Sequence, residues 1–176
     1  MAKIAEIERT PNENAMRFVL KEPLTNGTAF SFENIHEAEE DELASKLFQY
    51  NGVMNVYYFS NYITVTQDGT RDWSDLLREV AVPIREATQV EKIEQKEELD
   101  IDDERYKHIK EILDDTVMPY LLSDGGGLEI VDLQGDILKI HYQGACTSCS
   151  ISTTGTLMSI EGLLKQYYPE LTVISV

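Results

Sequence analysis

Basic residues are scarce in this sequence of 176 residues. It has 15 lysines and arginines against 32 aspartates and glutamates, which gives a formal net charge of −17. Binding of nucleic-acid phosphates needs clustered basic side chains, so a protein that coats DNA or RNA is excluded. The same shortage excludes docking on an anionic membrane leaflet. We therefore expect neither nucleic acid nor membrane among its partners.

Long apolar runs are also missing. No stretch approaches the roughly 20 residues that a membrane helix needs. Residues 1–9 lack the apolar core of a secretory signal and carry acids early, so the expected location is cytoplasmic. The two cysteines, Cys146 and Cys149, are too few for a disulfide framework. Hydrophobic residues make up 42% of the chain, which is enough for a packed core.

The composition changes sharply between Gln89 and Glu104, where apolar residues thin out and acids accumulate. Such a segment repels itself and stays solvated, so it is interpreted as an interdomain linker. An exposed continuation of the preceding helix is the alternative. The sequence thus predicts one domain over residues 1–88, a linker over 89–104 and a second domain over 105–176.

The first domain is predicted to have the element order ββαββα. The expected elements are strands over 15–19 and 27–32, a helix over 39–48, strands over 53–59 and 62–66, and a helix from 72 through 84. Ser60-Asn61 is the expected turn of a hairpin, and Asp72 is the expected N-cap of the last helix. Pro83 is expected to kink or break that helix.

The second domain is predicted to have the order αββαβ, so the fold class is α+β with two small domains. The expected elements are a helix over 105–122, strands over 128–133 and 137–142, a helix over 151–168 and a strand over 171–176. Residues 123–127 are expected to form a turn. Pro119 is expected to distort or end the first of these helices.

Cys146 and Cys149 lie on a short loop between a strand and a helix. Backbone N–H groups at a helix N-terminus favour thiolates and lower their pKa values, and Gly144 allows a tight turn. The spacing alone fits a dithiol redox centre, half of a zinc site, an iron–sulfur site, or two small residues that pack a loop. Redox chemistry ranks first by spacing, but the motif comes late in its domain, after two antiparallel strands, which is unlike thioredoxin.

Stoichiometry constrains the iron–sulfur interpretation. A cluster usually takes four thiolates, and one chain offers two. A symmetric dimer would supply Cys146 and Cys149 from each subunit around the two-fold axis. A cluster held in this way on an exposed loop should be labile, which suits a carrier that delivers clusters.

Several motifs resemble a known family. Ser123-Asp124-Gly125-Gly126, two strands, and then Gly144-Ala145-Cys146-Thr147-Ser148-Cys149 with a Ser/Thr-rich helix start resemble the C-terminal domain of NifU, the Nfu-type iron–sulfur scaffold. Residues 109–115 and 168–170 also fit. The stretch from Thr10 to Phe18, with further matches at 47–53, 62–66 and 72–73, resembles the Nfu N-terminal domain.

This resemblance implies a homodimer that holds a [4Fe–4S] cluster, or a [2Fe–2S] cluster, on Cys146 and Cys149 of both chains. It implies a scaffold or carrier that is not an enzyme and that meets cluster-assembly proteins and apo iron–sulfur recipients. The N-terminal domain would select or position those recipients. Ser150 stands where the family usually has Pro, and Gly127 where many members have Asp. The alternative function is a thiol–disulfide oxidoreductase that uses the same two cysteines.

Overall fold

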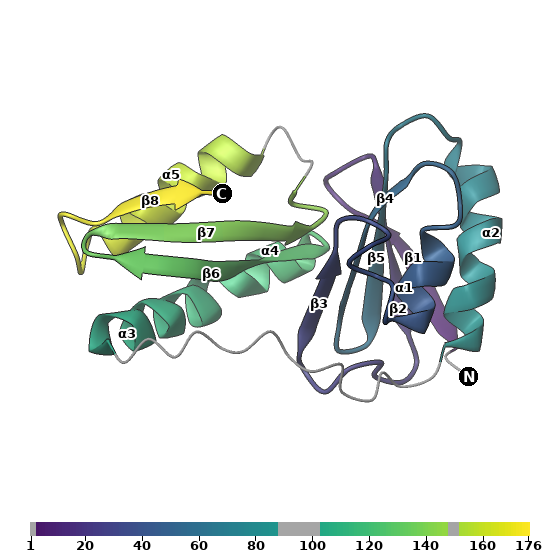
Figure 1. Cartoon of the computed structure of the whole chain (residues 1–176), viewed down its shortest axis with the longest axis horizontal. Helices are drawn as coiled ribbons and strands as arrows, with labels where there is room; N and C mark the ends of the chain where they lie inside the picture. Colours follow the sequence, from purple (N-terminus) through teal and green to yellow (C-terminus); the bar gives the residue numbers. More distant parts are fainter. Residues whose placement is uncertain (1–2, 88–102, 148–151) are drawn as a thin grey trace. The chain divides into compact units, whose positions relative to one another are not determined.

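The computed structural model describes residues 3–87, 103–147 and 152–176. The chain divides into two compact units, Met1–Glu94 and Gln95–Val176 (Figure 1). Most of the predicted linker lies outside the described residues. No helix in the described ranges is both long enough and apolar enough to cross a membrane.

Within residues 3–87, the N-terminal unit is a five-stranded antiparallel sheet with two helices. Its elements are β1 (Ile4–Arg9), β2 (Ala15–Leu20), β3 (Ala29–Phe32), α1 (Glu42–Leu47), β4 (Val53–Phe59), β5 (Tyr62–Gln67) and α2 (Trp73–Glu86). The strand order is β1-β2-β5-β4-β3. Leu47 of α1, Val80 of α2, and Phe18 and Val65 of the sheet belong to one buried cluster, so both helices pack on the same face (Figure 1).

Two features of this unit, a hairpin and a helix cap, were predicted correctly from the local sequence. The predicted hairpin is confirmed: β4 and β5 pair antiparallel, and Ser60 between them has a positive φ of 53°. The predicted cap of α2 is also confirmed, because the Asp72 carboxylate accepts a hydrogen bond from the Ser74 backbone N–H at 2.7 Å. Both features are set by residues within four positions of each other.

Two expectations for this unit were wrong, and a third, that Pro83 kinks or breaks the last helix, was wrong as to the break. The first strand of the unit is β1, which the predicted order omitted, so the observed order is βββαββα. The first helix begins at Glu42 rather than at residue 39, because the buried Asp41 side chain caps it and accepts from the Ala44 N–H at 2.6 Å. Pro83 does not end α2, which continues to Glu86.

The stretch that carries the N-terminal resemblance forms a hydrogen-bonded turn between β1 and β2. The Thr10 hydroxyl donates to the carbonyl of Asn12 at 2.8 Å, and the Asn14 N–H donates to the Asn12 side chain at 3.0 Å. The Trp73 indole donates to the Glu13 carbonyl at 2.9 Å. This last bond ties the turn to the start of α2.

Within residues 103–147 and 152–176, the C-terminal unit is a three-stranded sheet with helices packed against it. Its elements are α3 (Glu104–Ile112), the π-helical turn η1 (Leu113–Val117), α4 (Met118–Ser123), β6 (Gly126–Gln134), β7 (Ile137–Gly144), α5 (Ser152–Leu164) and β8 (Thr172–Ser175). Strand β7 is central; it pairs antiparallel with β6 and parallel with β8. Ile109 of α3, Leu121 of α4, Ile160 of α5 and Ile140 of β7 share one buried cluster. The predicted αββαβ order, and with it the α+β fold class, is confirmed.

The predicted single helix over 105–122 is interrupted by the π-helical turn. Pro119 lies at the start of α4, directly after η1. Proline has no N–H, and its ring clashes with the carbonyl four residues earlier, here that of Asp115. A wider π turn relieves this clash and lets the chain continue helically to Ser123. The expected distortion at Pro119 is therefore observed, but the helix does not end there.

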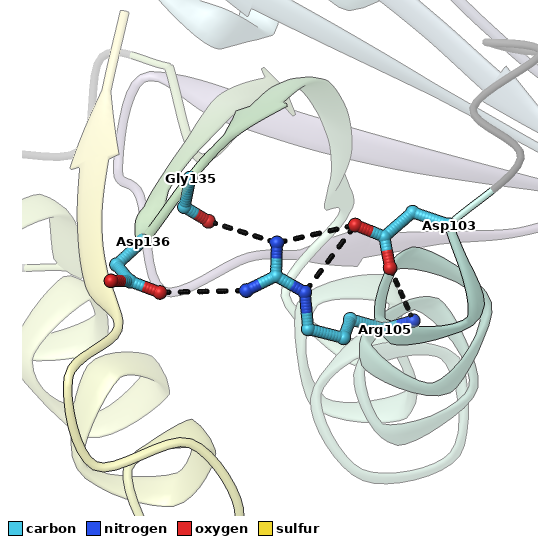
Figure 2. Close-up of polar contacts among 4 residues, drawn as sticks. All are labelled: Asp103, Arg105, Gly135 and Asp136. Atoms are coloured by element: carbon cyan, nitrogen blue, oxygen red, sulfur yellow. Dashed lines mark hydrogen bonds and ion pairs between the residues drawn. The ribbon is translucent and has the colours of Figure 1, made fainter.

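Arg105 ties the start of α3 to the turn between β6 and β7. Its guanidinium Nη2 lies 3.2 Å from the Asp103 carboxylate and 3.2 Å from the Gly135 carbonyl, and Nη1 lies 3.4 Å from the Asp136 carboxylate. Figure 2 shows Arg105 between Asp103 on one side and Gly135 and Asp136 on the other. The Asp103 side chain also caps α3 by accepting from the Arg105 backbone N–H at 2.8 Å.

Arg105→Ala is expected to destabilise the C-terminal unit slightly, and by less at high salt, because the lost ion pairs are partly exposed and screened. Thermal unfolding followed by circular dichroism at low and high salt measures this. Lys165→Ala, which breaks an ion pair with Glu161 one helical turn away, is the matched control. An equal effect of both substitutions would contradict the bridging role of Arg105.

The same contacts give a pH dependence. The backbone N–H of Arg105, followed by its guanidinium, lowers the pKa of Asp103. A carboxylate with a lowered folded-state pKa stabilises the protein above its ordinary pKa, and this stabilisation is lost as the pH falls through the lowered value. The difference in stability between the protein and Arg105→Ala should therefore shrink in acid.

Candidate functional site

The candidate site lies where the end of β7 pairs with the start of β6. Gly126 pairs with Gly144 in the antiparallel ladder. Gly144 has a positive φ of 63°, as the predicted tight turn requires, and Gly125 has a φ of 86°. The Ala145 N–H donates to the Gly125 carbonyl at 3.3 Å, which holds the chain beyond β7 against the start of β6.

Cys146 lies directly after this turn. Its backbone N–H donates to the Gln143 carbonyl at 3.4 Å. Thr147 donates to the Gly144 carbonyl twice, from its backbone N–H at 3.2 Å and from its hydroxyl at 2.9 Å. The turn is therefore fixed by its own hydrogen bonds, and it gives Cys146 a defined position at the end of the sheet.

Gly126 leaves the space into which the Cys146 side chain packs. A Cβ atom at position 126 would lie 2.7 Å from Cys146 Sγ, 3.0 Å from Cys146 N and 2.3 Å from the Gln143 carbonyl oxygen. All three separations are well below van der Waals contact between nonbonded atoms. A side chain at position 126 is therefore incompatible with this position of Cys146. The sequence analysis quoted Gly126 within a turn motif, but its contact with Cys146 is visible only in the fold.

Cys146 is buried, which corrects the expectation of an exposed loop. It is 3% exposed and belongs to the cluster that packs the helices on the sheet. The physical reason is the missing side chain of Gly126, which lets the thiol turn inward beside β6. Residues 148–151, which include Cys149 and Ser150, lie outside the described residues. The assignment of Cys146 and Cys149 as ligands therefore stays a prediction.

Tyr142 of β7 is a second buried polar group near Cys146, and sequence reasoning missed it. Tyr142 is 4% exposed and lies in the same cluster as Cys146. Burial, together with negative charge on Cys146, raises the pKa of Tyr142 to about 12. The Nδ1 atom of the neighbouring His141 is hydrogen-bonded to the main-chain oxygen of Val176 at 2.8 Å. A tyrosine in a strand of alternating apolar residues gives no sequence signal beyond core packing.

Two family models together cover nearly the whole chain. A model described as the scaffold protein Nfu/NifU N-terminal domain matches residues 4–91. A model described as the NifU-like domain matches residues 109–175. The chain belongs to the Nfu/NifU family. The resemblance noted from the sequence is thus confirmed for both halves, and the site around Cys146 lies in the NifU-like domain.

Curated relatives match across both domains. The protein named NFU1 iron-sulfur cluster scaffold homolog, mitochondrial, of Drosophila persimilis is 29% identical over 94% of this chain and 62% of its own length. Its counterpart in Drosophila willistoni is 28% identical over 94% of this chain and 60% of its own. This chain therefore spans about three fifths of the length of these relatives.

Among solved structures, the solution structure of a NifU-like protein from Saccharomyces cerevisiae is similar to this chain. The two are 25% identical with a TM-score of 0.44, over 49% of this chain and 77% of the yeast one.

Proposed function

We propose that this protein is a non-catalytic scaffold that binds an iron–sulfur cluster as cargo on Cys146 and Cys149 and passes it to apo-proteins. Family membership supports the scaffold role, because the matching model and the relatives carry that description. It favours the scaffold over the alternative oxidoreductase. The observation that carries the proposal is the placement of the Cys146 thiol in a glycine-lined turn at the end of β7. A thiolate there is the ligand type that iron–sulfur clusters take.

The cluster would be shared between two copies of the chain. Each copy contributes two cysteines, and clusters usually need four thiolates. A two-fold symmetric dimer brings both pairs together with one interface. We favour [4Fe–4S] as the cargo, with [2Fe–2S] as the alternative, since both accept four thiolates.

Transfer would proceed by stepwise exchange of thiolate ligands. In each step one iron–sulfur bond to this chain breaks and one bond to a cysteine of the recipient forms. The released cysteine takes up the proton that the incoming thiol loses, and the oxidation states of the iron atoms do not change. The recipients are apo iron–sulfur proteins, and the suppliers are cluster-assembly proteins.

Anaerobic reconstitution of the full chain with ferrous iron and sulfide tests the proposal. We expect a brown protein with visible absorption bands and a mass that doubles on loading. Iron and sulfide analysis should give about four of each per two chains for [4Fe–4S], and about two of each for [2Fe–2S]. A chain that stays colourless, or a loaded form that remains a single chain, would overturn the proposal.

A further inference from the structure

We propose that the Tyr142 hydroxyl donates a hydrogen bond to the sulfur of Cys146 when that sulfur is an iron-bound thiolate. Tyr142 is thereby a positioning residue for the cargo rather than a ligand. This inference rests on the proposed function. It adds a hydrogen-bond donor to the cluster-bound sulfur, a role that the cysteines themselves do not fill.

The fold brings these two side chains to the same side of the sheet. Leu138, Ile140 and Tyr142 alternate along β7 and all belong to the cluster that the helices cover. Gly144 continues this alternation at the end of the strand, and Cys146 follows two residues later in the turn. The Cys146 side chain enters the same cluster. Both side chains therefore belong to one buried cluster on the side of the sheet that the helices cover. Both also lie next to the start of β6, because Tyr142 pairs with Leu128 and the Cys146 sulfur lies beside Gly126.

The Tyr142 hydroxyl is a hydrogen-bond donor that is not used within the described residues. Its hydroxyl oxygen is buried and has no hydrogen-bond partner among the residues that the structure describes. A buried hydroxyl without a partner is unfavourable. A phenylalanine at this position would fill the same core space without that penalty, so packing alone does not explain the hydroxyl.

Cys146 needs a donor once it binds iron. A neutral thiol is tolerated in a core, but a thiolate carries charge, and a buried charge requires hydrogen-bond donors. A tyrosine hydroxyl is protonated at neutral pH, so the Tyr142 hydroxyl can donate.

The Tyr142→Phe protein tests this directly, because it removes the hydroxyl and keeps the ring. Tyr168→Phe is the matched control: its hydroxyl pairs with His108 Nδ1 at 2.7 Å in the same unit. Each protein is reconstituted anaerobically, and its iron–thiolate stretching bands are recorded by resonance Raman spectroscopy in H2O and in D2O. Release of iron to a chelator is then timed.

We expect a solvent-isotope shift of an iron–thiolate band in the parent and in Tyr168→Phe, and a smaller shift in Tyr142→Phe. Hydrogen bonds to the sulfurs stabilise a cluster, so release from Tyr142→Phe should be about five-fold faster. An unchanged isotope shift overturns the inference, and so does a variant that differs from the parent in thermal stability alone. Failure of the parent itself to load a cluster would instead overturn the proposed function.

Discussion

Replacing either Cys146 or Cys149 with alanine is expected to abolish cluster binding while both units stay folded. Two chains offer four thiolates, and one substitution leaves two of them in a symmetric dimer. Loss of one cysteine per chain therefore removes half of the thiolates that would hold the cluster. The fold should survive, because removing the buried sulfur of Cys146 leaves a cavity of about one atom, at a cost of about 1 kcal/mol.

The measurement is anaerobic reconstitution followed by visible absorption and iron and sulfide analysis. Ser148→Ala is the control, because it changes a residue between the two cysteines without removing a thiol; it should load like the parent protein. Far-ultraviolet circular dichroism and the fluorescence of Trp73, the one tryptophan of the chain, check the fold. If the Cys146→Ala and Cys149→Ala proteins both carried iron and sulfide at the parent level, the ligand assignment would be refuted.

Elements set by neighbouring residues could be predicted from the sequence. The β4–β5 hairpin depends on a two-residue turn, and the start of α2 depends on the cap at Asp72, so both were placed within a residue. The edge strand β1 was missed, because Ile4 and Ile7 are its only large apolar residues among acids. It is held in place by pairing with the next strand, β2, which includes the ion pair between Glu8 and Arg17, and not by an apolar pattern of its own.

The candidate site could be located from the sequence, but its packing could not, and the assignment of its two cysteines as ligands stays a prediction. The two cysteines were identified from their spacing and from the family resemblance. The burial of Cys146 depends on Gly126, which is 20 residues earlier in the chain and on another strand. The role of Tyr142 depends on which face of β7 the helices cover. Both features come from tertiary packing, which no local pattern records.

Gly126→Ala is expected to be the most damaging substitution that leaves every predicted ligand in place. The new Cβ would lie 2.3 Å from the backbone carbonyl of Gln143 and 2.7 Å from Cys146 Sγ. A backbone atom cannot rotate away, so either the pairing of β6 with β7 opens at Gly126 or the turn that carries Cys146 shifts. Overpacking of this kind costs about 3 kcal/mol, and the displaced thiol should bind cluster weakly or not at all.

Gly162→Ala is the matched control, because it is the same chemical change where a Cβ would meet no atom within 4 Å. In the interior of α5 it should be neutral or stabilise by up to about 1 kcal/mol. Circular dichroism should show an earlier unfolding transition for Gly126→Ala, while Trp73 fluorescence, which reports the N-terminal unit, should not move. Normal stability together with normal cluster loading in Gly126→Ala would show that the thiol does not occupy the space beside Gly126 in solution. The buried position of Cys146 would then be wrong, and the role of Tyr142 would lose its geometric basis.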